Sequence, residues 1–347
     1  MTRRRICLNR EWKFLHDDVS GAEVPGFDDA SWQPIGLPHT FDLPYFRTPE
    51  FDVGYGWYRT RFEVSGSGCK CFLEFDGVFQ VAEVFVNGQR VGAHAGGYTG
   101  FSINITDAVR GGENVLAVRV NNLWNAQLQP RAGEHVFCGG IYRDVHLVVT
   151  DPLHVTWNGL SVTTPRVSAE FTTVNVRTEV RNDTDRPQIC NLRSQISDPA
   201  GQIVGVVKSR HSLAPHSTVE FDQTAAPIAQ PKLWHPDHPH LYSIRTQVYA
   251  DDRLVDEIEI PFGVRWFDWT ADRGFFLNGE HLYLRGVNAH QDHAGWGIAI
   301  TRAACERDVQ LIKEAGFNFV RGAHYPHHPA FADACDRLGL IFWSENA

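Results

Sequence analysis

Residues 317–346 read FNFVRGAHYPHHPAFADACDRLGLIFWSEN, and this stretch decides the fold class. Its first part, FNFVRGAHY (317–325), and its last part, LIFWSEN (340–346), are short apolar runs typical of buried strands. Between them, HHPAFADACDRLG (327–339) has the apolar spacing of a helix and ends in glycine. A strand, a helix and a second strand in this order predict a parallel β-α-β unit, because parallel strands need a crossover connection.

The sequence just before this stretch repeats the pattern. HLYLRGVN (281–288) is another apolar strand, and TRAACERDVQLIKEAG (301–316) is a helix that Thr301 can cap and Gly316 can end. Residues 263–347 are therefore predicted to form three strands and two helices of a parallel α/β domain. A sheet that stopped there would expose an apolar edge strand. We expect this edge to be covered, either by a missing C-terminal half or by another copy of the chain in a homo-oligomer.

The rest of the chain has the pattern of two β-rich domains. Residues 1–150 contain short alternating runs separated by Gly, Asn and Asp turns, which favours a jelly-roll β-sandwich. Within them, Val-Asn-Gly-Gln at 86–89 places Asn-Gly between two apolar runs and predicts a hairpin. Residues 151–262 contain alternating Thr and Val runs such as TTVNVRTEV (172–180), which are typical of an Ig-like β-sandwich. The predicted fold class is multidomain, with two β-sandwiches followed by a parallel α/β segment.

Composition excludes several classes of protein. The chain has 32 basic and 41 acidic side chains, a formal net charge of −9 at pH 7, so it carries no basic field for nucleic acid. No apolar run approaches the roughly 20 residues that span a bilayer, so no membrane partner is expected. The seven cysteines are scattered and odd in number, which favours reduced, buried thiols and a cytoplasmic location.

Polar side chains lie at the ends of all three predicted parallel strands. They are Asn288, His290 and Asp292 at the first strand, Arg321 and His324 at the second, and Glu345 at the third. Because the carboxyl ends of parallel strands meet at one edge, we expect these side chains to line one pocket that suits a polyhydroxylated ligand. A structural alternative stays open for single residues. Arg321 and Glu345 can pair across neighbouring strands, and Asn288 can cap a turn.

Other chemistries have weaker support in the sequence. Zinc ligands could in principle come from His290, His293, His324, His327 and His328. None of these forms a helical i, i+4 pair around a general base, so no metal is expected. The sequence contains no Gly-x-Ser-x-Gly elbow, and its glycines at 95–100 lack phosphate-binding spacing before a helix. No cofactor is therefore predicted.

One loop of the first β-rich domain also carries a carboxylate. The run QPRAGEHVFCGGIYRDV (129–145) places Glu134 just before a glycine turn and a strand. A single carboxylate in a loop is usually solvated surface. The importance of Glu134 depends on whether this loop reaches the third domain.

Four motifs in the first domain stand in a fixed order, namely WYRTRF, AEVFVNGQRVGAHAGGYTGFSINIT, ENVLAVRVNN and GGIYRDV. They resemble the N-terminal sugar-binding jelly roll of glycoside hydrolase family 2. PFGVRWF followed by FFLNGEHLYLRGVNAHQDH resembles that family's junction from its Ig-like domain into its (β/α)8 TIM barrel. DVQLIKEAGFNFVRGAHYPHHPAFADACDRLGLIFWSEN is similar to the family's first barrel stretch. The resemblance implies a jelly roll, an Ig-like sandwich and the start of a TIM barrel.

The resemblance also implies a β-linked carbohydrate as the substrate and assigns roles to single positions. Arg321 and His324 fall on the family's Arg-x-x-His, which is expected to line the subsite of the sugar to be released. Asn288, His290 and Asp292 fall on the end of the first barrel strand, close to the same subsite.

Two carboxylates have weaker or indirect roles. Glu345 falls on a carboxylate that is expected to orient neighbouring polar groups. Glu134 falls near a position where some members carry an Asp that reaches the sugar hydroxyls, and this chain departs from them by carrying the longer Glu. The family's acid/base and nucleophile glutamates follow its fourth and seventh barrel strands, and this chain contains neither strand.

The expected function is that of a β-galactosidase-type glycoside hydrolase that retains configuration. Within the family, the chain's His-Gln-Asp motif and the Gly-Trp-Gly motif that follows it most resemble the β-galactosidase group. The β-glucuronidases and β-mannosidases share the same scaffold. This chain is expected to carry the sugar-recognition half of the site and to be inactive alone. The alternative is a standalone carbohydrate-binding protein or one piece of a split enzyme.

Overall fold

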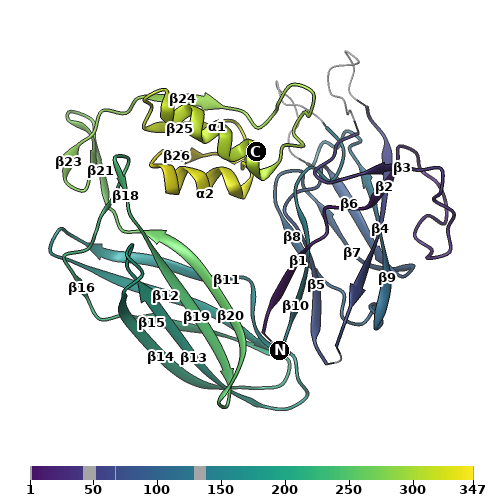
Figure 1. Ribbon diagram of the computed structural model, residues 1–347, viewed down its shortest axis with the longest axis horizontal. Coiled ribbons are helices and arrows are strands. Elements are labelled where there is room, and N and C mark those ends of the chain that lie inside the picture. The colour runs from purple at the N-terminus through teal and green to yellow at the C-terminus, as the bar shows by residue number, and fades with distance from the viewer. Residues whose placement is uncertain (1, 42–51, 67, 129–137, 347) are drawn as a thin grey trace.

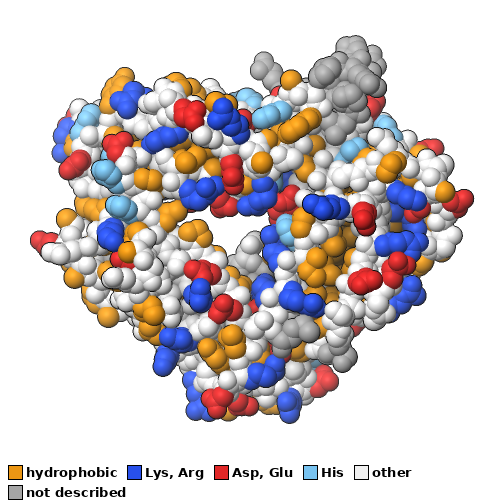
Figure 2. All heavy atoms as spheres, viewed as in Figure 1, with side chains coloured by type: hydrophobic (Ala, Val, Ile, Leu, Met, Phe, Trp, Pro, Cys, Tyr) orange, Lys and Arg blue, Asp and Glu red, His pale blue; other side chains and the backbone are white. Residues whose placement is uncertain are grey.

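The computed structural model describes residues 2–41, 52–66, 68–128 and 138–346. They form two β-sandwiches and a helix-containing α/β segment (Figure 1). Figure 2 shows a hollow at the centre of the molecule, between these three parts. In the described residues, no helix is both long and apolar enough to cross a membrane.

The first sandwich packs a sheet in the order β1-β10-β5-β8 on a sheet in the order β3-β2-β4-β9-β6-β7. The strands are β1 (Arg4–Cys7), β2 (Trp12–Leu15), β3 (Gln33–Ile35), β4 (Tyr55–Val64), β5 (Lys70–Phe75), β6 (Val81–Val86), β7 (Gln89–Ala95), β8 (Phe101–Asn104), β9 (Gly112–Asn121) and β10 (Val145–Thr150). Trp12, Tyr58 and Leu73 are almost fully buried in the core between the sheets. Asn87 and Gly88 have φ values of 52° and 85° and join β6 to β7, which confirms the predicted Asn-Gly hairpin.

The second sandwich packs the sheet β11-β12-β15, with β16 paired to β12, on the sheet β14-β13-β19-β20. Its strands are β11 (Leu153–Val167), β12 (Phe171–Asn182), β13 (Gln188–Ser197), β14 (Ile203–Leu213), β15 (Ser217–Thr224), β16 (Ile228–Ala229), β19 (Leu241–Ala250) and β20 (Arg253–Gly263). Along β13, alternate residues from Cys190 to Ile196 are buried, as expected for a strand with one face on a core.

The last part of the chain is a parallel sheet with helices. Strands β24 (Gly286–Ala289), β25 (Phe319–Gly322) and β26 (Ile341–Ser344) pair in parallel, and helices α1 (Arg302–Glu314) and α2 (Pro329–Leu338) connect them. Thr301 caps α1 by accepting a hydrogen bond from the backbone N–H of Ala304 at 3.2 Å, and Gly316 follows its end with φ 87°. Both predicted helices are confirmed, as is the parallel order of the strands.

Small two- and three-stranded sheets join the second sandwich to this segment. They are β17 (Trp234–His235) with β18 (His238–Pro239), and β21 (Phe267–Thr270) with β22 (Gly274–Leu277) and β23 (Glu280–His281). The indole N–H of Trp234 donates to the carbonyl of Asp336 in α2 at 2.8 Å. The small sheet of β17 and β18 therefore contacts helix α2 of the α/β segment directly.

The prediction of one continuous strand over 281–288 was wrong. Strand β23 ends at His281 and β24 begins only at Gly286. The backbone between them bonds elsewhere: Leu282 donates to the carbonyl of Phe275, and the Asn318 side chain bonds the carbonyl of Tyr283. The hydrogen bonds of these residues therefore do not belong to the parallel ladder.

All seven cysteines are free thiols, as predicted. Five of them are buried, whereas Cys69 is half-buried and Cys7 is exposed. The expectation of burial was therefore wrong for Cys7. Cys7 lies on β1, an edge strand of its sheet, and all four residues of this strand are exposed.

Candidate functional site

The strand ends of the parallel sheet collect the polar residues that the sequence places there. In the register of the sheet, Asn288 of β24 lies beside Arg321 of β25, and Ser344 of β26 lies beside Gly322. Because the three strands are parallel, the residues that follow them come out at one edge. The side chains of this edge form the candidate site.

An arginine–glutamate pair lies at the centre of the site. The Arg321 guanidinium donates two hydrogen bonds to the two carboxylate oxygens of Glu345, at 2.9 and 3.0 Å. This bidentate contact holds the pKa of the Glu345 carboxyl below its usual value, so Glu345 is ionised at neutral pH. The structural alternative of an ion pair between neighbouring strands is confirmed for these two residues.

His324 and Asn288 complete the contacts of this pair. The Nδ1 atom of His324 lies 3.2 Å from the Arg321 guanidinium and 3.4 Å from a Glu345 oxygen. The side-chain oxygen of Asn288 accepts from Arg321 at 3.5 Å. Asn288 thus bonds the ion pair across the strands and does not cap a turn. Four of the predicted site residues form one connected group.

His290 joins this group through ring contacts. Its imidazole lies edge-on to the ring of His324, with ring centres 5.3 Å apart, and its Nδ1 lies 3.2 Å from the hydroxyl of Tyr325. The backbone N–H of Gln291 donates to the same hydroxyl at 3.4 Å. The phenol can therefore accept from Gln291 and donate to His290, which fixes the orientation of that imidazole.

Asp292 and Glu134 are the other two predicted site residues. Asp292 lies in the loop after β24, and its charge acts on Tyr325, where it adds to burial in raising the pKa of the phenol. It shares no hydrogen bond with the group around Arg321 among those that the described residues show. Glu134 lies outside the described residues.

Residues of the first sandwich pack against Tyr325 of the candidate site, a contact between domains that the sequence did not predict. The ring of Tyr98 stacks on the ring of Tyr325, with centres 4.8 Å apart and planes 3° from parallel. Both rings belong to a buried cluster with Phe79, Tyr142 and Ile298. Burial raises the pKa of both phenols far above neutral pH, so both remain protonated.

Arg143 ties the same sandwich to the site by hydrogen bonds. Its guanidinium, almost fully buried, donates to the side-chain oxygen of Gln291 at 3.0 Å and to the carbonyl of Pro326 at 2.6 Å. Tyr98 and Arg143 lie within two of the motifs on which the family resemblance rests. Their presence in those motifs was the available signal, but their partners could be found only in the folded chain.

His327 and His328 have structural contacts. The two ring nitrogens of His327 lie 3.0 and 3.1 Å from the carbonyls of Tyr325 and Ala289, and His328 caps α2 by accepting from the backbone N–H of Ala330. Burial lowers the pKa of His328 to about 4. Within the described ranges, no three His, Cys, Asp or Glu side chains are placed to bind a metal ion.

Two β-sandwiches followed by parallel β-α units match the architecture of solved multidomain glycoside hydrolases. The chain belongs to glycosyl hydrolases family 2: models of its sugar-binding domain, its middle domain and its TIM barrel domain match residues 11–152, 158–265 and 270–347. The predicted fold class of jelly roll, Ig-like sandwich and partial TIM barrel is thereby confirmed.

Named relatives cover nearly the whole of this chain. It is 34% identical over 352 residues to a putative β-glucuronidase of Formosa agariphila and 36% identical over 355 residues to a β-galactosidase of Bacteroides ovatus. These alignments cover 99% of this chain and 41% of each relative. The crystal structure of a Bacteroides uniformis β-glucuronidase matches with a TM-score of 0.96 and 36% identity, over 99% of this chain and 42% of that one. The chain thus spans about two fifths of the length of these relatives.

Proposed function

We propose that this chain is the sugar-recognition portion of a retaining β-glycosidase of the β-galactosidase type. The observation that carries the proposal is the connected group at the strand ends, in which Arg321, Glu345, His324 and Asn288 contact one another. Hydroxyl groups both donate and accept hydrogen bonds, so a sugar suits a site that offers imidazole, amide, guanidinium and carboxylate groups together.

Glu345 is suited to orienting its neighbours and not to acid catalysis. A general acid needs a carboxyl whose pKa is raised, so that it carries a proton to the leaving group. Arg321 has the opposite effect on Glu345, because the guanidinium stabilises the ionised form. Retention also needs a second carboxyl roughly 5–5.5 Å from the first, on the other side of the scissile bond. We assign both catalytic glutamates to barrel strands that the 347 residues do not include.

The charge of the site favours a neutral sugar over a uronic acid. Relatives of this chain carry both names, β-galactosidase and β-glucuronidase. Within the described group at the strand ends, Arg321 is the permanent positive charge. One edge of its guanidinium already donates to Glu345, and the remaining Nη atom donates to Asn288. A substrate carboxylate would have to compete with Glu345 for that guanidinium. A β-galactoside is therefore the preferred substrate, and a β-glucuronide is the alternative.

The purified 347-residue protein is expected to show no steady hydrolysis of an aryl β-galactoside, because the paired carboxylates are absent from it. The full-length β-galactosidase of Bacteroides ovatus serves as the positive control in the same assay. Steady turnover whose pH profile shows two ionising carboxyls would contradict our placement of the catalytic glutamates. The intact mass of the protein from its native host separates a piece of a longer enzyme from a standalone binding protein.

His324→Ala is expected to weaken galactose binding about tenfold, because the variant loses an imidazole that contacts both Arg321 and Glu345. Titration of galactose followed by ligand-observed NMR measures the change. His281→Ala is the matched control, since His281 is exposed and lies on β23, before the parallel sheet of β24, β25 and β26 begins. Equal affinities of the unaltered protein and His324→Ala would remove His324 from the sugar subsite.

A further inference from the structure

A groove runs between the two sandwiches and opens into the hollow at the centre of the molecule (Figure 2). It consists of two adjoining cavities of about 380 and 810 Å³. Both cavities are lined by Arg3, Glu74, Thr156 and Trp157. The larger cavity is also lined by Pro326 and His327 of the α/β segment, so all three parts of the chain contribute to its wall. We call the two cavities together the interdomain groove.

A bulge in β11 brings a tryptophan to the middle of this groove. Val155 pairs with Val180 of β12, but the next pair is Leu160 with Thr178, so residues 156–159 bulge out of the ladder. Trp157 lies on the bulge, and 44% of its surface is exposed although it borders both cavities. An indole left open at this place offers a flat apolar face to a ligand in the groove.

The backbone of the bulge is tightly specified. Asn158 has a left-handed φ of 54°, and a side chain at Gly159 would clash with Thr156 and approach the carbonyl of Glu179 to 3.0 Å. The backbone of the bulge is therefore closely packed at Gly159, two residues after Trp157. An aromatic side chain has only two rotatable side-chain bonds, so it loses little conformational freedom when it binds a ligand.

Charged groups of both signs surround the tryptophan in the larger cavity. Its wall carries the guanidinium groups of Arg5, Arg143 and Arg302, and the carboxylates of Glu74, Asp76 and Asp333. Arg5 lies 3.2 Å from Glu74 and 3.6 Å from Asp76, and Arg302 lies 3.6 Å from Asp333. Arg3 is already neutralised by two hydrogen bonds to Asp256. The wall thus alternates donors and acceptors without a strong net charge.

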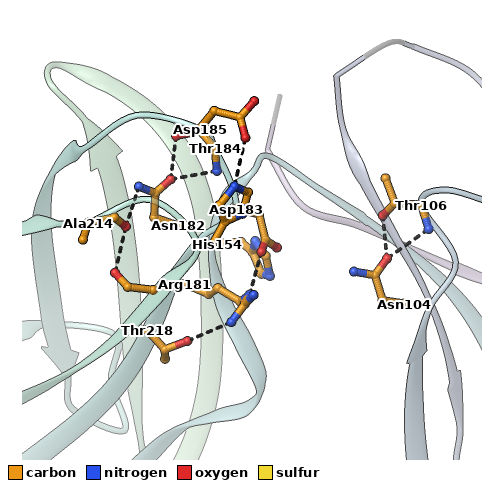
Figure 3. A network of polar contacts seen from close by, with 12 residues as sticks. Asn104, Thr106, His154, Arg181, Asn182, Asp183, Thr184, Asp185, Ala214 and Thr218 are labelled. Atoms are coloured by element: carbon orange, nitrogen blue, oxygen red, sulfur yellow. Dashed lines mark hydrogen bonds and ion pairs between the residues drawn. The ribbon is translucent and has the colours of Figure 1, made fainter.

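The smaller cavity continues the polar wall toward the second sandwich. Figure 3 shows Asn104 of β8 on one side, and His154 and Arg181 of the second sandwich on the other. Arg181 is held by hydrogen bonds to Asp183 at 2.6 Å and to Thr218 at 3.3 Å. Polar side chains therefore line the groove on both sides of Trp157, over a length that exceeds one cavity.

We propose that the interdomain groove is a second carbohydrate site, which binds a neutral oligosaccharide with one sugar ring stacked on Trp157. The C–H face of a pyranose packs on the electron-rich face of an indole. Guanidinium groups only donate and carboxylates only accept, whereas each sugar hydroxyl does both and can bridge them. An anion is disfavoured, because three carboxylates share the wall with the arginines. This inference goes beyond the function proposed for the strand ends and does not depend on it.

The test measures binding of a β-linked galactose trisaccharide to the complete 347-residue protein by isothermal titration calorimetry. Trp157→Ala is expected to weaken binding about tenfold, and Trp157→Phe, which retains a ring, by much less. Trp269→Ala is the matched control, because Trp269 is also exposed but lies on β21, away from the groove. Unchanged circular dichroism of each variant shows that it has folded.

Other results would overturn the proposal. They are unchanged affinity in Trp157→Ala, an equal loss in Trp269→Ala, or binding of inorganic sulfate in place of the trisaccharide. Loss of trisaccharide binding in His324→Ala with no effect of Trp157→Ala would place the ligand at the strand ends and also reject the groove. A third result would count against the proposed function alone. In it, the unaltered protein binds no galactose at the strand ends, but it binds the trisaccharide and Trp157→Ala abolishes that binding.

Discussion

Between pH 7 and pH 5, the free energy of unfolding, summed over the first sandwich and the α/β segment, is expected to fall by roughly 6 kcal/mol. The cause lies in three buried histidines, His39, His146 and His328, whose pKa values burial lowers from 6.5 to about 4. His154 and His327 are buried as well, and burial lowers their pKa values in the same direction. Urea unfolding followed by tryptophan fluorescence at both pH values measures the change.

The free energy of unfolding falls, and does not rise, because the unfolded state binds protons at a higher pH than the folded state. As the pH falls through 6.5, the three histidines of the unfolded chain take up protons, while those of the folded protein stay neutral until the pH approaches 4. The unfolded state is stabilised over this window, and stability is lost as the pH falls. With pKa values of 6.5 and about 4, each histidine contributes roughly 2 kcal/mol between pH 7 and pH 5.

His328→Asn isolates one of these contributions. Asparagine is a good helix cap, so the variant keeps an acceptor for the backbone N–H of Ala330, and its stability at pH 7 is the reference for its own change with pH. Its loss of stability between pH 7 and pH 5 is expected to be smaller by roughly 2 kcal/mol. His211→Asn removes an exposed histidine and provides the comparison. Equal stability of the unaltered protein at the two pH values would refute the account.

Arg143→Ala is expected to lower the free energy that holds the first sandwich against the α/β segment by about 3 kcal/mol. The change removes a buried guanidinium and leaves Gln291 and the carbonyl of Pro326 without their donor. Unpaired polar groups that stay buried cost more than the lost hydrogen bonds themselves. The stacked pair of Tyr98 and Tyr325 would then bear more of the contact.

Cys138 reports on this contact directly. It is a fully buried cysteine that forms no disulfide and belongs to the same cluster as Tyr98 and Tyr325, so a thiol reagent reaches it when the contact opens. We expect its labelling rate, read by peptide mass spectrometry, to rise roughly a hundredfold in Arg143→Ala. Arg61→Ala is the control, because Arg61 forms an exposed ion pair with Glu113. Equal labelling rates in both variants would show that Arg143 does not hold the contact closed.

Local features of the fold could be predicted because their physical causes are local. The Asn87-Gly88 turn, the Thr301 cap and the helix end at Gly316 each depend on residues a few positions apart. The strand predicted over 281–288 failed, because Asn318, distant in sequence, bonds part of that backbone. Local alternation alone could not show that these hydrogen bonds leave the sheet.

The candidate site likewise has features that the sequence predicted and features that it did not. The gathering of Asn288, Arg321 and Glu345 at one edge follows from parallel strands, so the sequence predicted it. The stack of Tyr98 on Tyr325 joins residues from different domains, and no spacing in the chain indicates it. Trp157 was missed for a related reason, since a bulge changes which face of the strand a side chain occupies.

The contact between Tyr98, Arg143 and the residues beneath the strand ends has a consequence for recombining this protein with its homologues. A chimaera that takes its barrel from another family member would separate Tyr325 and Gln291 from the aromatic ring and guanidinium that support them. Crossover points chosen only at domain boundaries would therefore yield proteins with a misplaced His290 and weakened ligand recognition. Functional chimaeras should inherit these four positions together, as one unit of exchange that spans two domains.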